Sequence, residues 1–165
     1  MDYLFDVDGT LLDISHRLKF IREKPKSWKA FRDPIQKRWD EPIIPIINIF
    51  NALLMAGHNT IIVTARTKDE EYDTRKTLEQ WIPGSPGIPG MLDPTEDMDY
   101  VIPMYLRSNR DFRKDRIVKA EMLERIRMDG YRPKMVFEDR PSVINMWHEQ
   151  GLVVGDVRDP SKGDF

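Results

Sequence analysis

The sequence contains no cysteine. This absence excludes disulfide bonds, thiolate catalysis and zinc sites built on cysteine, and it is compatible with a reducing compartment. Long apolar runs are also missing. The first apolar stretch begins at Tyr3 and meets Asp6 at once, and the most apolar segment, residues 42–57, is interrupted by polar residues and too short to cross a bilayer. We therefore expect a cytoplasmic protein with no membrane partner.

An excess of charge of one sign is missing as well. The net charge of −2 favours neither a protein that coats nucleic acid nor one that binds membrane surfaces. Residues 107–134 are a local exception, with ten Lys or Arg against five Asp or Glu. This basic stretch could attract a polyanion or simply keep a helix surface solvated, and the sequence leaves both interpretations open.

Five short apolar runs are present, and most of them lack polar alternation, which is typical of parallel strands buried on both faces. They are YLFDV (3–7), NTIIVTA (59–65), YVIPMYL (100–106), KMVFED (134–139) and LVVGDV (152–157). Helical patterns lie between them, at 43–56, 68–82, 114–129 and 141–150. The alternation predicts one α/β domain over residues 1–165, with a doubly wound, mainly parallel five-stranded sheet of the Rossmann-like kind.

Two segments do not fit this alternation. Residues 13–41 predict a small helical cap inserted after the first strand, with one or two amphipathic helices. For its aromatic residues Trp28, Phe31 and Trp39 we favour packing within the cap over stacking on bases. Residues 83–99 are rich in Pro and Gly and predict a long loop.

Polar residues stand where three of the predicted strands end. Asp6 and Asp8 close the first, Thr64 lies at the end of the second, and the pair Glu138–Asp139 closes the fourth. In a parallel sheet the carboxyl ends of the strands share one edge, where binding sites form. We therefore expect these side chains to lie together in a site.

This set of residues suits phosphoryl transfer. Carboxylates at i and i+2 of an extended segment point the same way, so one of Asp6 and Asp8 can attack while the other protonates a leaving group. Other members would bind magnesium or stabilise charge: carboxylates suit Mg²⁺, a hydroxyl can donate to a phosphoryl oxygen, and an ammonium can neutralise it. These members are Glu138, Asp139, Thr64 and Lys119. The chemistry indicated is an aspartyl-phosphate pathway.

Four motifs occur in this order along the sequence: DVDGT after an apolar strand, IIVTAR, a helical lysine, and FEDR. Over residues 2–157 this order and spacing resemble the haloacid dehalogenase superfamily of phosphohydrolases. The stretches RSNRDFRKDRIVKAE and EDRPSVINMWHEQG and the terminal GDF further resemble the phosphatase half of bacteriophage polynucleotide kinase/3′-phosphatases. The resemblance implies a magnesium cofactor, a nucleotide or 3′-phosphorylated nucleic-acid end as partner, and a host cytoplasm if a phage encodes the chain.

The resemblance also implies roles for individual residues. Asp6 is the expected nucleophile, and Asp8 the general acid that later activates water. Arg17 and Arg66 are expected to contact the substrate phosphate or its neighbours. Lys119 is expected to stabilise the phosphoryl group.

For the remaining residues the resemblance implies supporting roles. Asp115, one helical turn before the lysine, is expected to orient it. Asp6, the backbone carbonyl of Asp8, Glu138 and Asp139 are the expected magnesium ligands. Relatives carry two aspartates at the last pair, so Asp139 is the stronger candidate of the two.

Several functions remain open at this level. No glycine is followed by lysine, so the P-loop that a kinase needs is absent from these residues, which predicts a phosphatase without a kinase. The basic stretch favours a polynucleotide 3′-phosphatase that heals strand ends. The low net charge and the cap favour a 5′- or 3′-mononucleotide phosphatase. A non-catalytic module that binds nucleic-acid ends, and a transferase that passes the phosphoryl group on, are further alternatives.

Overall fold

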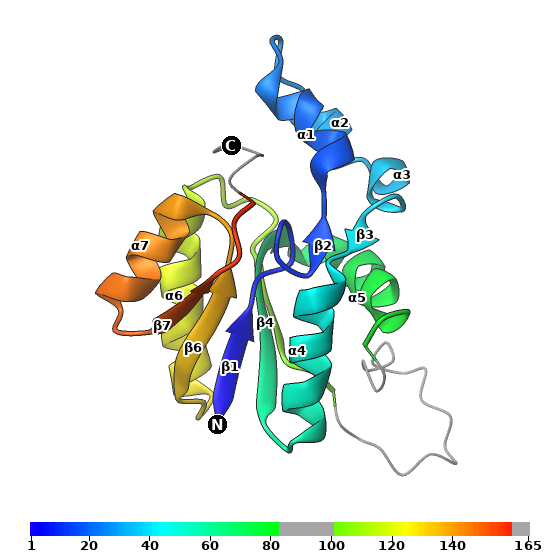
Figure 1. The fold of residues 1–165 in the computed structure, drawn as a ribbon. Coiled ribbons are helices and arrows are strands. Elements are labelled where there is room, and N and C mark those ends of the chain that lie inside the picture. The colour runs from blue at the N-terminus through cyan, green and yellow to red at the C-terminus, as the bar shows by residue number, and fades with distance from the viewer. Residues whose placement is uncertain (83–100, 160–165) are drawn as a thin grey trace.

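The computed structural model describes residues 1–82 and 101–159 (Figure 1). Its centre is a five-stranded parallel sheet of order β5-β4-β1-β6-β7. The strands are β1 (Asp2–Phe5), β4 (Asn59–Thr67), β5 (Met104–Arg107), β6 (Pro133–Glu138) and β7 (Val153–Asp156). The prediction of a doubly wound, Rossmann-like α/β fold is confirmed.

Helices cover both faces of the sheet, which explains the continuous apolar strands. On one face Leu4 packs with Met122 of α6 (Asp115–Met128) and Trp147 of α7 (Pro141–Glu149). On the other, the ring of Phe5 lies 4.8 Å from that of Phe50 in α4 (Ile44–Met55). The helix α5 (Glu71–Glu79) adds Leu78 to this second core. Because neighbouring residues of β1 face opposite cores, neither position admits a polar side chain.

Local sequence signals place the helix starts well. Thr67 and Glu70 form a capping box, with the backbone N–H of Thr67 donating to Glu70 Oε2 at 2.7 Å, and it opens a short 3₁₀ turn, η1 (Lys68–Glu70), that leads into α5. The strand predicted at 100–106 begins only at Met104. Pro103 precedes it and has no N–H to donate to a neighbouring strand, although its carbonyl accepts from Ile62.

Residues 13–41, the cap segment, form three short helices rather than the one or two expected. These are α1 (Ser15–Arg22), α2 (Trp28–Phe31) and α3 (Pro34–Lys37). The strands β2 (Leu12–Asp13) and β3 (Glu41–Pro42) pair antiparallel where the segment leaves and rejoins the body. Figure 1 shows α1 and α2 standing beyond the edge of the sheet where β1 ends.

The cap segment has a small apolar core of its own, in which Phe31 packs against Ile14, Leu18 and Ile21. The packing interpretation is therefore confirmed for Phe31. It is wrong for Trp39, which is 70% exposed, because one ring already covers this three-residue cluster. The loop predicted at 83–99 lies outside the described residues. Among the described helices, none has the length and apolar character needed to cross a membrane.

Candidate active site

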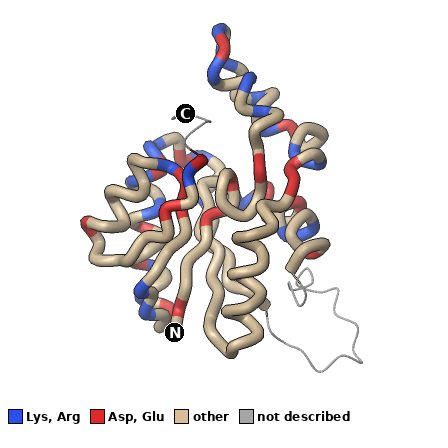
Figure 2. Tube along the Cα trace, in the orientation of Figure 1, with Lys and Arg blue, Asp and Glu red and all other residues tan. Residues whose placement is uncertain are grey.

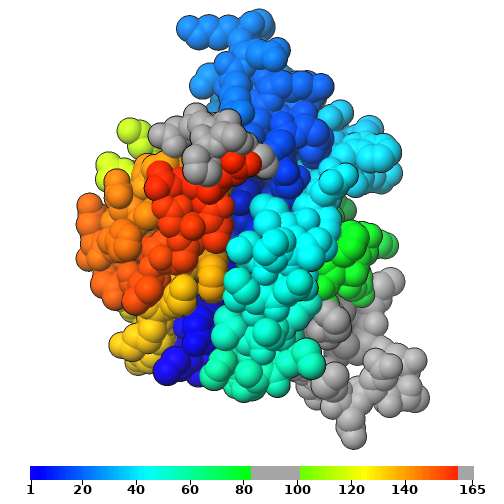
Figure 3. All heavy atoms as spheres, in the orientation of Figure 1, coloured from blue at the N-terminus to red at the C-terminus, as the bar shows by residue number. Residues whose placement is uncertain are grey.

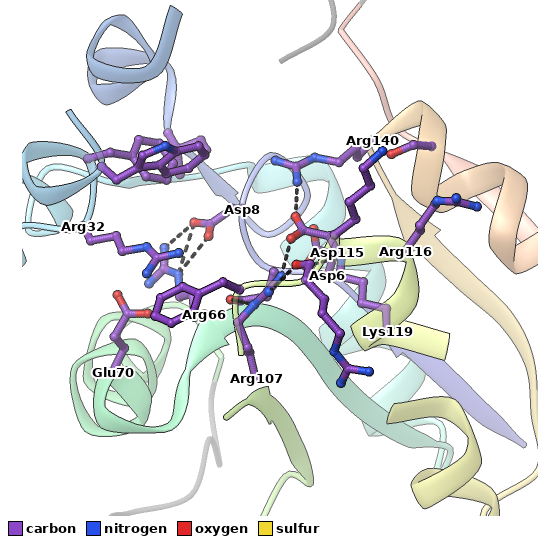
Figure 4. A pocket seen from close by; sticks show the side chains of 18 of the residues that line it. Asp6, Asp8, Arg32, Arg66, Glu70, Arg107, Asp115, Arg116, Lys119 and Arg140 are labelled. Carbon is purple, nitrogen blue, oxygen red and sulfur yellow. Dashed lines mark hydrogen bonds and ion pairs between the residues drawn. The ribbon is translucent and has the colours of Figure 1, made fainter. Parts of the chain in front are cut away.

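Charged residues are frequent along the edge of the sheet that faces the cap segment, whereas α4 carries none (Figure 2). A cavity of about 750 Å³ opens there, and Figure 4 shows the side chains that point into it. It is lined from the body by Asp6, Asp8, Arg66 and Lys119, and from the cap segment by Arg17 among others. In the space-filling view the cap segment stands over the rest of the chain at this end of the molecule (Figure 3). A cavity that Asp6 and Asp8 help to line therefore lies at the edge of the sheet where a site is expected.

The turn after β1 brings the two aspartates into this edge. The carbonyl of Val7 accepts hydrogen bonds from the N–H groups of Thr10, Leu11 and Leu12, which folds the chain back tightly. Gly9 has a φ of +88°, and a Cβ at this position would lie 2.0 Å from Oδ2 of Asp139. Only glycine permits this close approach. Gly9 of the first motif therefore allows Asp139 of the last motif to lie against the turn.

Asp6 belongs to an acidic cluster with Glu138 and Asp139, whose carboxylate oxygens lie within 4.8 Å of one another. Lys119 reaches in from α6, with its Nζ 2.9 Å from Asp6 Oδ1 and 2.7 Å from Glu138 Oε2. The indole N–H of Trp147 also donates to Glu138 Oε2, at 3.2 Å. The ends of β1 and β6 and one side of α6 thus fix the position of the predicted nucleophile.

The acidic cluster holds more negative charge than Lys119 balances. Burial and then the charge of Glu138 raise the pKa of Asp6 well above its usual value, although Lys119 opposes them. The same two causes raise the pKa of Asp139 to about 7. Burial alone would lower the pKa of Lys119, but Asp6 and Glu138 outweigh it and raise that pKa. Buried carboxylate oxygens with excess negative charge are a donor set that suits a hard divalent cation such as Mg²⁺.

Asp8 lies in a second, guanidinium-rich cluster. Its Oδ1 is 2.6 Å from Nη2 of Arg17 and 2.6 Å from Nη2 of Arg66. Asp40, at the end of the cap segment, accepts from both arginines too, at 2.8 Å from Arg17 Nε and 2.7 Å from Arg66 Nη2. Two carboxylates and two guanidinium groups therefore join the cap segment to the body.

The charges of this cluster decide the state of Asp8. Burial alone would raise the pKa of Asp8, but the guanidinium groups of Arg66 and Arg17 outweigh it and hold that pKa well below its usual value. Asp8 is therefore an ionised carboxylate in this structure. Sequence reasoning missed Asp40, whose only signal is an acidic residue next to the point where the cap segment returns to the body.

The family model described as the phosphatase domain of the polynucleotide kinase PNKP matches residues 2–165. The chain belongs to this family. It is a phosphatase of the haloacid dehalogenase superfamily, as the motifs predicted.

Solved structures share the fold of this phosphatase domain. One is a chain of a Pnkp1/Rnl/Hen1 RNA repair complex, with a TM-score of 0.69 and 22% identity; the match covers 99% of the present chain and 43% of that one. The class C acid phosphatase from Bacillus anthracis with tungstate bound has a TM-score of 0.60 and 15% identity over 96% and 66% of the two chains. A putative phosphatase from Clostridium difficile has a TM-score of 0.60 and 14% identity, over 93% and 82%. The phosphatase domain thus spans less than half of the repair-complex chain.

Asp115 is placed differently from what the resemblance implied. Its carboxylate accepts from Arg107, at the end of β5, and from Arg140, which follows the last motif. Within the described residues the ion pairs of Lys119 go to Asp6 and Glu138, so these two orient the lysine. Asp115 instead fixes two arginines that line the cavity, neither of which sequence reasoning singled out.

Thr64 is fully buried at the end of β4. Its Oγ1 accepts a hydrogen bond from the backbone N–H of Arg66 at 3.2 Å. Of the residues that the structure describes, it is not one that lines the cavity. The contact seen for this hydroxyl is therefore to the turn that presents Arg66, and its predicted contact with a phosphoryl oxygen stays a prediction.

Proposed function

We propose that this phosphatase domain is a Mg²⁺-dependent phosphomonoesterase that removes a 3′-phosphate from a nucleic-acid end through an aspartyl-phosphate on Asp6. The observation that carries the proposal is the position of Asp6, 2.9 Å from Lys119 and grouped with Glu138 and Asp139. A carboxylate so placed has a cation beside it to neutralise charge that develops on a phosphoryl group.

The metal would be held by Asp6, by Asp139 and by the backbone carbonyl of Asp8. Glu138 already accepts from Lys119 and Trp147 through Oε2 and from the N–H of Arg140 through Oε1, at 3.3 Å. We therefore assign Glu138 chiefly to orienting the lysine and Asp139 to direct ligation. When bound, Mg²⁺ offsets the repulsion between the nucleophile and the incoming phosphate.

In the first step a carboxylate oxygen of Asp6 attacks phosphorus, and the bond from phosphorus to the 3′-oxygen breaks. Asp8 gives its proton to that oxygen, which leaves as the 3′-hydroxyl. In the second step Asp8 takes a proton from water as the water attacks the phosphoryl group. This releases inorganic phosphate and restores the Asp6 carboxylate.

The first step requires a protonated Asp8, whereas Arg17 and Arg66 hold it ionised. A phosphate dianion is a strong competitor for the same two guanidinium groups. Substrate binding would therefore withdraw these groups from Asp8 and raise its pKa. The proton donor is then produced only when a phosphate is present, with Asp40 keeping both arginines in place.

Three observations support a strand end as the substrate over a mononucleotide. The family is described as a phosphatase domain of a polynucleotide kinase, and one structural neighbour comes from an RNA repair complex. The cavity also has more exposed cations than a single phosphate needs, among them Arg32, Lys114 and Arg116. Since these 165 residues contain no P-loop, we assign them the phosphatase reaction alone.

The test is phosphate release in Mg²⁺ from a 3′-phosphorylated oligonucleotide, measured beside its 5′-phosphorylated isomer and a panel of 3′- and 5′-mononucleotides. The proposal expects the highest kcat/KM for the 3′-phosphorylated oligonucleotide and none of this activity in Asp6→Asn. A preference for mononucleotides would make this a nucleotide-pool enzyme instead. Salt-sensitive oligonucleotide binding without turnover would support the non-catalytic module.

A further inference from the structure

We propose that Trp28 is the base-stacking platform for the nucleoside that leaves, so that the cap segment recognises the last base of the strand. This inference rests on the proposed function and adds to it a residue that contacts the substrate. It adds a part in binding to a ring for which the sequence favoured packing within the cap.

A continuous row of rings and charges joins Trp28 to the predicted acid. The ring of Trp28 meets that of Phe31 edge to face, with centroids 5.9 Å apart. The guanidinium carbon of Arg17 lies 4.4 Å from the centroid of Phe31, and Nη2 of Arg17 is 2.6 Å from Asp8 Oδ1. All four side chains line the same cavity, so its cap-side wall runs from solvent down to Asp8.

The chemistry of the reaction places the leaving nucleoside on this wall. The general acid must lie within hydrogen-bond reach of the leaving oxygen, about 2.6–3.2 Å away. Asp8 lies on the cap side of the cavity and the Asp6 nucleophile lies deeper, beside Lys119 (Figure 4). A phosphoryl group between them therefore directs its leaving sugar, and the attached base, toward the cap segment.

Trp28 is available for this contact. It is 53% exposed, although the cap core of Ile14, Leu18 and Ile21 is already covered by Phe31. An indole adds sequence-tolerant stacking to a base because every base has a π face. Arg32 lies over the same ring at 5.8 Å and points into the cavity from the cap side, where it would meet the next phosphate of the strand (Figure 4).

A second exposed tryptophan supplies the comparison. Trp39 also belongs to the cap segment and is even more exposed, yet it lines a different cavity, between α3 and α5. Exposure alone would give both tryptophans the same part in binding. We assign base stacking to Trp28 because, of the two tryptophans, Trp28 is the one connected to Asp8 through Phe31 and Arg17.

The experiment uses two oligonucleotides of the same sequence, each ending in a 3′-phosphate. In one the terminal nucleoside is normal, and in the other it is replaced by an abasic sugar. We measure kcat/KM for the unaltered protein and for Trp28→Ala, Trp28→Phe and Trp39→Ala. Trp28→Ala should lose about 10- to 100-fold on the normal end and less than about threefold on the abasic end. Trp28→Phe should recover most of the loss, and Trp39→Ala should behave as the unaltered protein on both ends.

Three results would overturn the inference. One is an equal loss on both ends in Trp28→Ala, which means that the ring supports the cap rather than a base. Another is the same loss in Trp39→Ala. The third is failure of the unaltered protein to release phosphate from either end, which defeats the proposed function and this inference with it. The first two leave the proposed function standing.

Discussion

Asp6 and Asp8 are separated by one residue, but their surroundings have opposite charge. Asp6 shares a buried cluster with Glu138 and Asp139 and one lysine, so negative charge is in excess and its pKa is raised. Asp8 has two guanidinium groups at 2.6 Å, and its pKa is lowered. The proposed nucleophile, Asp6, thus has surroundings that disfavour its charge, and the proposed acid, Asp8, has surroundings that favour its charge.

The difference lets two identical side chains take the separate roles that we propose for them. The acidic cluster holds less positive charge than negative charge, and a divalent cation can supply the difference. The guanidinium cluster has positive charge that a phosphate dianion can take over from Asp8. In the proposed function, each aspartate therefore reaches its working state only when a ligand binds, a divalent cation beside Asp6 and a phosphate dianion beside Asp8.

Removing the charge of Asp6 should have the largest effect of the changes that test the contrast between Asp6 and Asp8. Asp6→Asn should reduce phosphate release by roughly 10⁴-fold or more, because an amide cannot form the phosphoryl-enzyme. The same change relieves like-charge repulsion, so without metal Tm should rise by about 2–4 °C. Phosphate-release assays check the loss of activity, and thermal melts check the rise in Tm. Turnover that survives the substitution would show that Asp6 is not the nucleophile.

Removing the charge of Asp8 should act in the opposite direction on stability. Asp8→Asn takes a carboxylate from between Arg17 and Arg66, so Tm should fall. Its activity on an alkyl phosphate should drop by about 10²–10⁴-fold, and much less on an activated aryl phosphate whose leaving group needs no proton. Equal losses on the two substrates would argue that Asp8 is not the acid.

Asp40 tests whether the guanidinium cluster ties the cap segment to the body. Asp40→Asn should destabilise the fold by about 3–5 kcal/mol, since it leaves buried guanidinium charge uncompensated. The neighbouring exposed Glu41→Gln is the matched control and should change stability little. Denaturant unfolding measures both. If the two variants are equally stable, Asp40 does not hold the arginines.

Asp139 tests the acidic cluster with metal alone. Mg²⁺ at about 100 times its Kd should stabilise the unaltered protein by about 2.7 kcal/mol, read as a rise in Tm. Asp139→Asn should lose most of that rise, whereas Glu124→Gln, on the exposed side of α6, should keep it. A full magnesium-dependent rise in Asp139→Asn would remove this residue from the ligand set.

The sequence predicted the sheet and its active edge because both follow from local patterns. Strands buried on two faces, such as the one around Phe5, have to be continuously apolar. The motif residues then follow the strand ends, so the proximity of Asp6 and Glu138 can be inferred from the sequence alone. The capping box at Thr67 is equally local.

The cap segment was less predictable for physical reasons. Its helices α2 and α3 contain four residues each, too few for a helical period to show in the sequence. The partners of Asp40 lie 23 and 26 residues away along the chain, and the pairing of Asp115 with Arg140 spans 25. Such ion pairs form between segments that are distant in the sequence, so no residue spacing predicts them.

The short ribbon of β2 and β3 sets Asp13 opposite Glu41, so the two ends of the cap segment lie side by side. A loop with neighbouring ends can be lengthened or exchanged without moving the strands to which it is attached. Its base, which provides Arg17 and Asp40, must be kept because these charges surround Asp8. Its outer part, which includes Trp28, can diverge. The fold thereby separates the charges around Asp8 from the part of the cap segment that can change in length and sequence.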